Sequence, residues 1–194
     1  DALSHVKYYE EGIISVPVAA NNKIDNFIKA GVPRLWAYYC CGQSVGVSNR
    51  FMAMPGARTR IMGIQCFKYG IEGFLQWGYN FYFNQDSHDA INPYVDSTGN
   101  YFVPSGDTYS VYPAQDGTAL ESMRILHFRE GLDDMRALYL AESLVGREKV
   151  LETIEPIVKE MTDANIVFSR CIDRSSDMMK LREKIDEIVM NALN

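Results

Sequence analysis

The sequence predicts an α/β fold, in which about three parallel strands with crossover helices are followed by a C-terminal helical segment. In the first half of the chain, short runs rich in β-branched and aromatic residues alternate with stretches of helical period. Such alternation is typical of a parallel sheet. The last third shows helical periodicity alone, and 47% of the 194 residues are hydrophobic, which is enough for a substantial core.

The first two predicted strands flank a helix. Residues 13–19 are rich in β-branched side chains and predict a strand. Asn21 or Asn22 then offers a helix N-cap, and Gly31 is placed to end that helix. Residues 35–41 predict the second strand.

The third predicted strand follows a loop and a second helix. Residues 45–54 form the loop, Pro55 suits the first turn of the helix, and Gly70 suits its C-terminal cap. The apolar run 74–82 then predicts the third strand. The order strand, helix, strand, helix, strand predicts a parallel sheet with right-handed crossovers.

A long segment without periodicity comes next. Residues 84–107 are rich in Asp, Asn, Ser, Gly and Pro, and their scattered aromatics predict an ordered loop packed over the sheet. Residues 109–112 predict a short strand. The capping-box pattern Thr118–Glu121 then predicts the start of a helix that continues up to Gly146.

Two more helices are expected at the C-terminal end. The first contains Pro156, which should bend it, and the second starts near Ser176. We therefore divide the chain into residues 1–146, which carry the sheet, and residues 147–194, a helical appendage.

Composition and motifs argue against several classes of partner. The formal net charge of −6 argues against nucleic acid, and no stretch approaches the about 20 apolar residues that span a membrane. The four Cys and three His lack metal-binding spacing, and we expect the Cys to be small buried apolar residues. No Gly-rich turn of the phosphate-binding kind follows a predicted strand. We expect no metal and no cofactor.

The segment Gly73–Tyr82 holds the strongest candidates for ligand contact. Ligand sites in α/β proteins lie where buried strands end. Trp77 and Tyr79 share one face of the predicted strand because side chains alternate, and Asn80 follows them. An aromatic face packs on the C–H face of a sugar, and an amide bonds its hydroxyls. These residues indicate a sugar-binding platform. The alternatives are core packing for the aromatics and an Asx turn for Asn80.

Five further residues are candidates for substrate contact. Trp36 and Tyr38 lie on one face of the second strand, where core packing and a site wall suit the sequence equally. Asn49 and Arg50 follow that strand, and Arg50 offers a planar fork to a carboxylate, either of a ligand or of Asp107. We favour the ion pair. Asp107 either accepts hydrogen bonds from sugar hydroxyls or caps a turn.

Several short motifs follow one another in a specific order. They are Trp36–Cys40, Ser48–Phe51, Arg58–Arg60, Gly73–Leu75, Trp77–Asn80, Ser105–Asp107, Val111–Pro113, Ser122–Arg124 and Arg129–Asp134. Together they resemble the C-terminal part of glycoside hydrolase family 123-like proteins, a region also catalogued as the bacterial domain of unknown function 4091. The resemblance spans roughly residues 1–145.

The resemblance implies a (β/α)8 barrel of TIM type, of which residues 1–146 are the C-terminal portion, with the long loop 84–107 and the last barrel helix at 119–145. It implies hydrolysis of β-linked N-acetylhexosamine glycans, notably N-acetylgalactosaminides, by a substrate-assisted retaining mechanism. The acetamido oxygen of the sugar attacks the anomeric carbon, an Asp polarises the acetamide, and an adjacent Glu protonates the leaving oxygen. That Asp–Glu pair belongs to a strand upstream of Asp1, so we expect no catalytic residue in this chain.

We therefore expect a piece of a larger catalytic unit. The chain opens at Asp1 without a signal-like segment, whereas a complete barrel typically needs about 250 residues. The open sheet would be covered by the missing barrel half, by a second copy or by the C-terminal helices.

The first function hypothesis is a glycoside hydrolase fragment, inactive alone, that binds a glycan containing N-acetylhexosamine. The alternative is a non-catalytic glycan-binding or assembly module. The resemblance suggests export from a bacterial cell, and no local signal in the sequence indicates a compartment.

Overall fold

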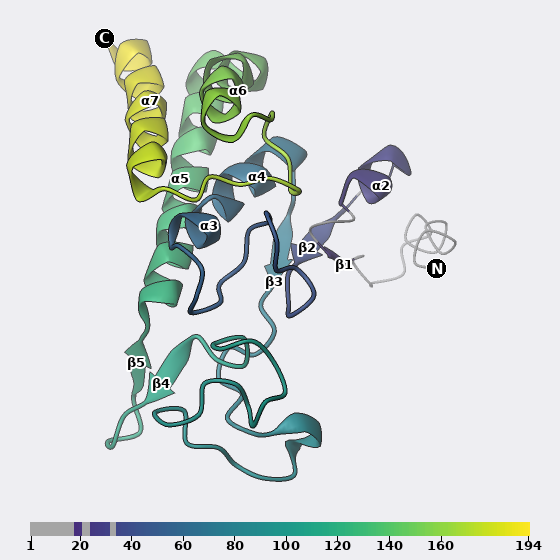
Figure 1. Cartoon of the computed structure of the whole chain (residues 1–194). Helices are drawn as coiled ribbons and strands as arrows, with labels where there is room; N and C mark the ends of the chain where they lie inside the picture. Colours follow the sequence, from purple (N-terminus) through teal and green to yellow (C-terminus); the bar gives the residue numbers. More distant parts are fainter. Residues whose placement is uncertain (1–17, 21–23, 32–33) are drawn as a thin grey trace.

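The protein has a mixed α/β architecture in which a small sheet lies between helices and a loop-rich region (Figure 1). The structure is a computed structural model that describes residues 18–20, 24–31 and 34–194. The expected strand residues 13–17 and the expected N-caps Asn21 and Asn22 lie outside the described residues.

The sheet consists of three short parallel strands in the order β1, β2, β3. Their bounds are Val18–Ala20 for β1, Trp36–Tyr38 for β2 and Gly73–Leu75 for β3. Helix α2 (Ile24–Lys29) connects β1 to β2, and Gly31 follows it with a φ of +71°, as a left-handed glycine after a helix should. The predicted parallel order is confirmed.

The two faces of the sheet differ in burial. Ala37 and Tyr39 are fully buried in a core cluster that includes residues of α2 and of α4 (Met62–Tyr69). Trp36 and Tyr38 alternate with them along the chain, point to the opposite face, and are only half-buried. Helices therefore cover one face, and the other face carries partly exposed aromatics.

The third strand is shorter than the sequence predicts. β3 ends at Leu75, and Gly78 has a φ of +64°. A Cβ at Gly78 would lie 2.7 Å from the carbonyl oxygen of Asp107, so this turn requires glycine. The prediction that Trp77 and Tyr79 share one face of a strand is therefore wrong, because both lie in the turn-rich segment that follows β3.

The helix predicted between β2 and β3 is present as two pieces. They are α3 (Ala57–Arg60) and α4, which ends at Gly70 as expected. Gly70 has a φ of +62°, and its N–H bonds the carbonyls of the last helical turn.

The long loop 84–107 contains only one short 3-10 turn, Gln85–Ser87, among its residues. It leads to a two-stranded antiparallel ribbon, in which β4 (Val111–Pro113) pairs with β5 (Ala119–Glu121). The short strand expected at 109–112 is thus observed close to its predicted place.

The predicted capping box is wrong. The N–H and hydroxyl of Thr118 both bond the Asp116 carboxylate, which closes the turn of the ribbon instead of starting a helix. Helix α5 (Met123–Val145) starts later than expected, with Ser122 as its N-cap. The Ser122 hydroxyl accepts a hydrogen bond from the N–H of Ile125 at 3.3 Å.

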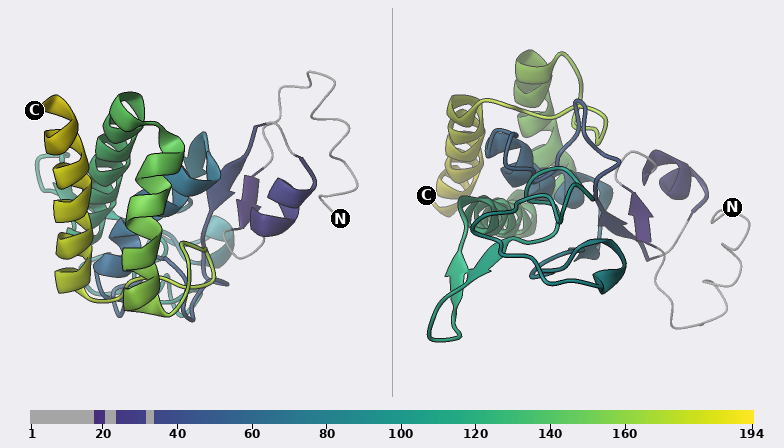
Figure 2. Two further views of the ribbon diagram at one scale, coloured as in Figure 1. Left: turned by 90° about the horizontal axis from the view of Figure 1, so that it is seen from above. Right: turned by 60° about the horizontal axis from the view of Figure 1, so that its bottom comes forward.

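The long helices gather on the side of the molecule opposite to β1 and α2 (Figure 2). Helices α6 (Arg147–Thr162) and α7 (Ser175–Leu193) complete the group, and α6 continues through Pro156. One apolar cluster joins residues of α3, α4, α5, α6 and α7. Residues 147–194 therefore share a core with the helices that cover the sheet.

A buried ion-pair network ties three of these helices together. Asp134 of α5 is 0% exposed, and its two carboxylate oxygens accept hydrogen bonds from Arg60 of α3 at 2.7 and 2.9 Å. Arg182 of α7 adds a third bond at 3.1 Å. The pairing satisfies the buried carboxylate and orients α3, α5 and α7 relative to one another.

The cysteines do not behave alike. Cys66 is buried as predicted, but Cys41 is exposed, which contradicts the prediction for that residue. Within the described part of the chain, no three His, Cys, Asp or Glu side chains gather as metal ligands. No helix in that part has the length and apolar character needed to cross a membrane.

Candidate functional site

The segments that follow β2 and β3 meet in the loop-rich region, and Arg50 lies where they meet. Its side chain is 2% exposed, and Nη2 donates to the carbonyl oxygens of Trp77 and Asp107, the latter at 2.8 Å. One guanidinium thus joins the loop after β2, the turn after β3 and the end of the long loop. We call Tyr39, Arg50, Asp107 and Arg124 the strand-end cluster.

Arg50 and Asp107 form the ion pair that the sequence suggested. Nη1 of Arg50 lies 3.4 Å from Oδ1 of Asp107, and both side chains are almost fully buried. Burial raises the pKa of Asp107, although the charges of Arg50 and Arg124 lower it in part. Burial also lowers the pKa of Arg50. Removing both charges from water is costly, so this pair is a weak source of stability.

Tyr39 and Arg124 border this pair. The guanidinium carbon of Arg50 lies 5.4 Å from the ring centre of Tyr39, and burial raises the pKa of that phenol. Nη1 of Arg124 donates to the carbonyl oxygen of Gly106. Arg50 therefore pairs with the Asp107 carboxylate, and the charge of Arg124 also acts on it.

Several buried polar atoms in and beside the cluster have no hydrogen-bond partner among the described residues. They are the Tyr39 hydroxyl, Arg50 Nε and Nη1, Gln76 Oε1, both Asp107 carboxylate oxygens, the Thr108 and Ser110 hydroxyls, and Arg124 Nη2. A buried polar group without a partner is unfavourable. Their concentration at the strand ends distinguishes this region from the helical core.

Asn49 is used to shape the loop after β2. It is fully buried, and its Nδ2 donates to the carbonyls of Cys40 and Gln43 at 2.9 and 2.7 Å. Its Oδ1 accepts from the N–H of Arg50 at 2.8 Å. The amide group therefore holds Arg50 in place through backbone contacts.

Trp77 is half-buried at the turn after β3. Its ring packs with Phe81 and Phe102, with ring centres 5.7 and 6.2 Å apart. Tyr79 is 46% exposed, and Asn80 is also exposed and makes an isolated antiparallel bridge with Tyr109. The three predicted platform residues thus occupy one turn next to the strand-end cluster, with their side chains partly open to solvent.

Trp36 and Tyr38 lie on the less covered face of the sheet. In the register of β2 and β3, Trp36 lies opposite Gly73 and Tyr38 opposite Leu75, which is 40% exposed. A Cβ on Gly73 would collide with the Trp36 indole. The indole therefore packs there because residue 73 has no side chain.

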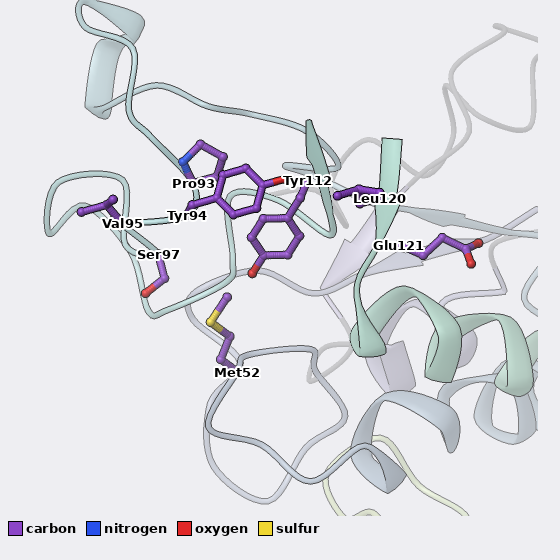
Figure 3. A pocket seen from close by; sticks show the side chains of 8 residues that line it. All are labelled: Met52, Pro93, Tyr94, Val95, Ser97, Tyr112, Leu120 and Glu121. Carbon is purple, nitrogen blue, oxygen red and sulfur yellow. The ribbon is translucent and has the colours of Figure 1, made fainter. Parts of the chain in front are cut away.

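Sequence reasoning missed part of this region. Tyr39 could have been found from strand alternation, which places it opposite Tyr38. Arg124, which sequence reasoning did not assign to the site, donates a hydrogen bond to the backbone carbonyl of Gly106. A pocket of about 580 Å³ beside the long loop was not predicted, and it is lined by Met52, Pro93, Tyr94, Val95, Ser97, Tyr112, Leu120 and Glu121 (Figure 3). Nothing in a non-periodic loop indicates which side chains will converge.

Comparison with known proteins places this arrangement in a family. The model of the glycoside hydrolase 123 catalytic domain matches residues 1–141. Among solved structures, the chain is similar to a family 123 glycoside hydrolase from Clostridium perfringens, studied for glycolipid glycan hydrolysis, with a TM-score of 0.56 and 15% sequence identity. No curated protein matches.

The similarity to the Clostridium perfringens enzyme covers 89% of this chain and 29% of that chain, so this chain spans less than a third of its length. At this identity the likeness shows the fold alone. The family model carries the assignment, because it matches well over half of the 194 residues. The chain belongs to glycoside hydrolase family 123, a family of carbohydrate-active hydrolases.

Proposed function

We propose that this chain is the C-terminal part of the (β/α)8 barrel of a glycoside hydrolase that cleaves β-linked N-acetylhexosamine glycans, notably N-acetylgalactosaminides. In this proposal the chain supplies substrate contacts, and the catalytic Asp–Glu pair comes from a part of the enzyme outside residues 1–194. Family membership supports the reaction class. The chain spans 29% of the similar Clostridium perfringens enzyme, so in this proposal the other strands of the barrel come from the rest of the longer protein.

The two faces of the sheet support the barrel proposal. In a (β/α)8 barrel, helices cover the outer face of the strands and side chains fill the interior. Here helices cover the face that carries Ala37, whereas Trp36 and Tyr38 on the other face remain half-buried. Further barrel strands would bury that second face.

The single observation that carries the site proposal is the position of Arg50. It is buried at the carboxyl ends of parallel strands, where barrel enzymes build their active sites, and it holds the carbonyls of Trp77 and Asp107. We assign sugar contacts to Trp77, Tyr79 and Asn80.

Trp36 and Tyr38 are proposed as a wall of the same site. Asn49, Arg50 and Asp107 are assigned a positioning role, because their side chains are buried and two of them are tied to backbone groups.

The proposed contacts suit substrate-assisted chemistry. In that mechanism the acetamido oxygen of the sugar must lie close to the anomeric carbon, so holding the ring in one orientation raises the rate. An aromatic platform restrains the ring through its C–H face, and an amide side chain bonds its hydroxyls. The residues of this chain would thus orient the sugar, while proton transfer is left to the Asp–Glu pair.

A non-catalytic glycan-binding module is the second candidate. It is favoured by the burial of Asp107, since the carboxylate of the strand-end cluster is 1% exposed and paired with Arg50. Both candidates bind sugar, and they differ in whether the longer protein hydrolyses a glycoside.

Tryptophan fluorescence tests the binding site directly, because the chain has two Trp residues, Trp36 and Trp77. In Trp36→Phe the indole of Trp77 is the only reporter. We expect N-acetylgalactosamine to change its emission. Trp77→Ala should abolish the change. A flat titration for both the unaltered chain and Trp36→Phe would remove the platform.

Hydrolysis of a chromogenic N-acetyl-β-galactosaminide tests catalysis. Residues 1–194 alone should show no turnover, whereas the protein encoded by the complete open reading frame should. There Trp77→Ala should lower kcat/KM about tenfold, since an aromatic contact contributes about 1–1.5 kcal/mol. Turnover by residues 1–194 that disappears when one of their own carboxylates is changed would contradict the proposal. Sugar binding without turnover by the complete protein would favour the binding module.

A further inference from the structure

The pocket beside the long loop lies between that loop and the β4–β5 ribbon (Figure 3). Tyr94 comes from the loop, Tyr112 from β4 and Leu120 from β5, while Met52 reaches it from the segment that follows Arg50. Its volume of about 580 Å³ lies within the range of small-molecule sites. None of these pocket residues belongs to the strand-end cluster or to the predicted platform.

Two tyrosine rings form one wall of the pocket. Tyr94 is 58% exposed, yet its hydroxyl donates to the carbonyl oxygen of Pro113 at 2.8 Å. Its backbone N–H bonds the Asn92 side chain at 3.0 Å. Its ring centre lies 5.3 Å from that of Tyr112, with 37° between the ring planes. The exposed ring is therefore held at both ends.

Tyr109 supports this wall from the protein interior. It is fully buried, and its single hydroxyl proton is shared between the carbonyl oxygens of Pro93 at 2.8 Å and Asp96 at 3.1 Å, on either side of Tyr94. Its ring centre lies 5.2 Å from that of Tyr112. One buried phenol thus restrains both the loop with Tyr94 and the strand with Tyr112, so the two rings are in place before a ligand arrives.

The chemistry of the lining restricts the ligand. The eight lining residues include no Lys, Arg or His, which argues against a phosphate or another anion. Their one charged group is the Glu121 carboxylate, which points away from the two tyrosine rings (Figure 3). What remains is a rigid aromatic wall with apolar flanks, open to solvent, and the Ser97 hydroxyl. Such a surface suits the C–H face of a neutral pyranose.

We propose that this pocket is a second sugar-binding site, which holds a neutral pyranose unit of the glycan away from the platform formed by Trp77. The inference rests on the proposed function, because a glycan substrate with more than one sugar is the ligand that would occupy both sites. Tyr94 and Tyr112 are its binding surface, and Leu120, which lies directly across the ribbon from Tyr112, is an apolar neighbour of that surface.

Saturation-transfer NMR on residues 1–194 with lactose tests the site. Lactose is a neutral disaccharide, and the Tyr94 variants separate its binding at this pocket from binding at Trp77. We expect lactose to bind, Tyr94→Ala to weaken binding at least tenfold, and Tyr94→Phe to stay within about threefold because it keeps the ring. Leu120→Asp places a charge beside Tyr112 at a 49% exposed position and should also weaken binding, which gives a second result if Tyr94→Ala is unstable.

Tyr101→Ala is the matched control, because Tyr101 is a 94% exposed tyrosine of the same loop that does not line the pocket. It should bind lactose as the unaltered chain does. The inference is wrong if the unaltered chain does not bind lactose, if Tyr94→Ala and Leu120→Asp bind it normally, or if Tyr94→Phe fails as completely as Tyr94→Ala. The fluorescence response of Trp77 to N-acetylgalactosamine should persist in Tyr94→Ala, so failure of this site and failure of the proposed function give different results.

Discussion

Two regions of this molecule bury an aspartate against arginine, and they do so differently. In the helical region, both oxygens of Asp134 accept hydrogen bonds from Arg60, and Arg182 adds another. In the strand-end cluster, Asp107 lies 3.4 Å from Arg50, and neither of its carboxylate oxygens has a hydrogen-bond partner among the described residues.

The difference separates a structural ion pair from the proposed binding region. A buried carboxylate with all its hydrogen bonds holds the surrounding elements in fixed positions. A buried carboxylate without them retains the free-energy cost of its removal from water. The strand-end region also contains Gly78 in a left-handed turn, and the adjoining loop holds Asn100 and Tyr101 at positive φ. Strained backbone and unsatisfied polar groups are tolerated where function requires them.

The largest expected effect is on the helical side of this comparison. Asp134→Ala leaves Arg60 and Arg182 without their shared buried partner, and we expect a loss of about 3–5 kcal/mol in the free energy of unfolding. Urea denaturation measures it. Asp133→Ala is the control, because this exposed neighbour pairs with Arg136 one turn along α5 and should change stability by less than about 0.5 kcal/mol. Equal effects of the two substitutions would show that the network does not hold the helices.

A smaller effect is expected at the turn after β3. Gly78→Ala places a side chain at a φ of +64° and 2.7 Å from the Asp107 carbonyl oxygen, so we expect a loss of about 1–3 kcal/mol and a weaker fluorescence response to N-acetylgalactosamine. Gly70→Ala has a similar φ of +62° but no atom within 4 Å of the new Cβ. It should lose only about 1 kcal/mol and leave binding unchanged. If both variants bind equally, the turn does not position Trp77.

The smallest effect is a pH dependence. Because the folded-state pKa of Asp107 is raised, the folded protein binds this proton more tightly than the unfolded chain does. The contribution of Asp107 to stability is therefore most favourable at low pH, and declines as pH rises from the unfolded pKa of 3.8 through the folded value. Asp107→Asn lacks this titration, so its stability relative to the unaltered chain should increase with pH across that range. Urea denaturation at several pH values measures the difference, and a decrease with pH would mean that Arg50 lowers the Asp107 pKa below its ordinary value.

Much of the fold was predictable from local patterns. The alternation of β-rich and helical segments predicts the parallel sheet, and Gly31 and Gly70 mark helix ends because both adopt positive φ there. The stripes of apolar residues after Gly146 predict α6 and α7. These features depend on neighbouring residues, which the sequence displays directly.

The errors came from residues whose contacts are with distant parts of the chain or within a turn. The apolar run 74–82 has the composition of a strand, but contacts with the Asp107 segment turn the chain at Gly78. Thr118 and Glu121 match a capping box. However, the Thr118 hydroxyl donates to the Asp116 carboxylate, and the backbone of residues 119–121 pairs with β4 as a strand. In both places a tertiary or turn contact is stronger than the local preference.

The sequence alone determined the α/β class of the fold, the C-terminal ends of helices at Gly70 and Gly146, and the family to which the chain belongs, because these depend on spacing and on short motifs. Only the tertiary structure decided that Arg50 joins Trp77 to Asp107 and that Tyr94 and Tyr112 line one pocket. The physical reason is that these groups come from loops, whose side chains follow no period. Their positions depend on which distant backbone carbonyls and rings they contact after folding.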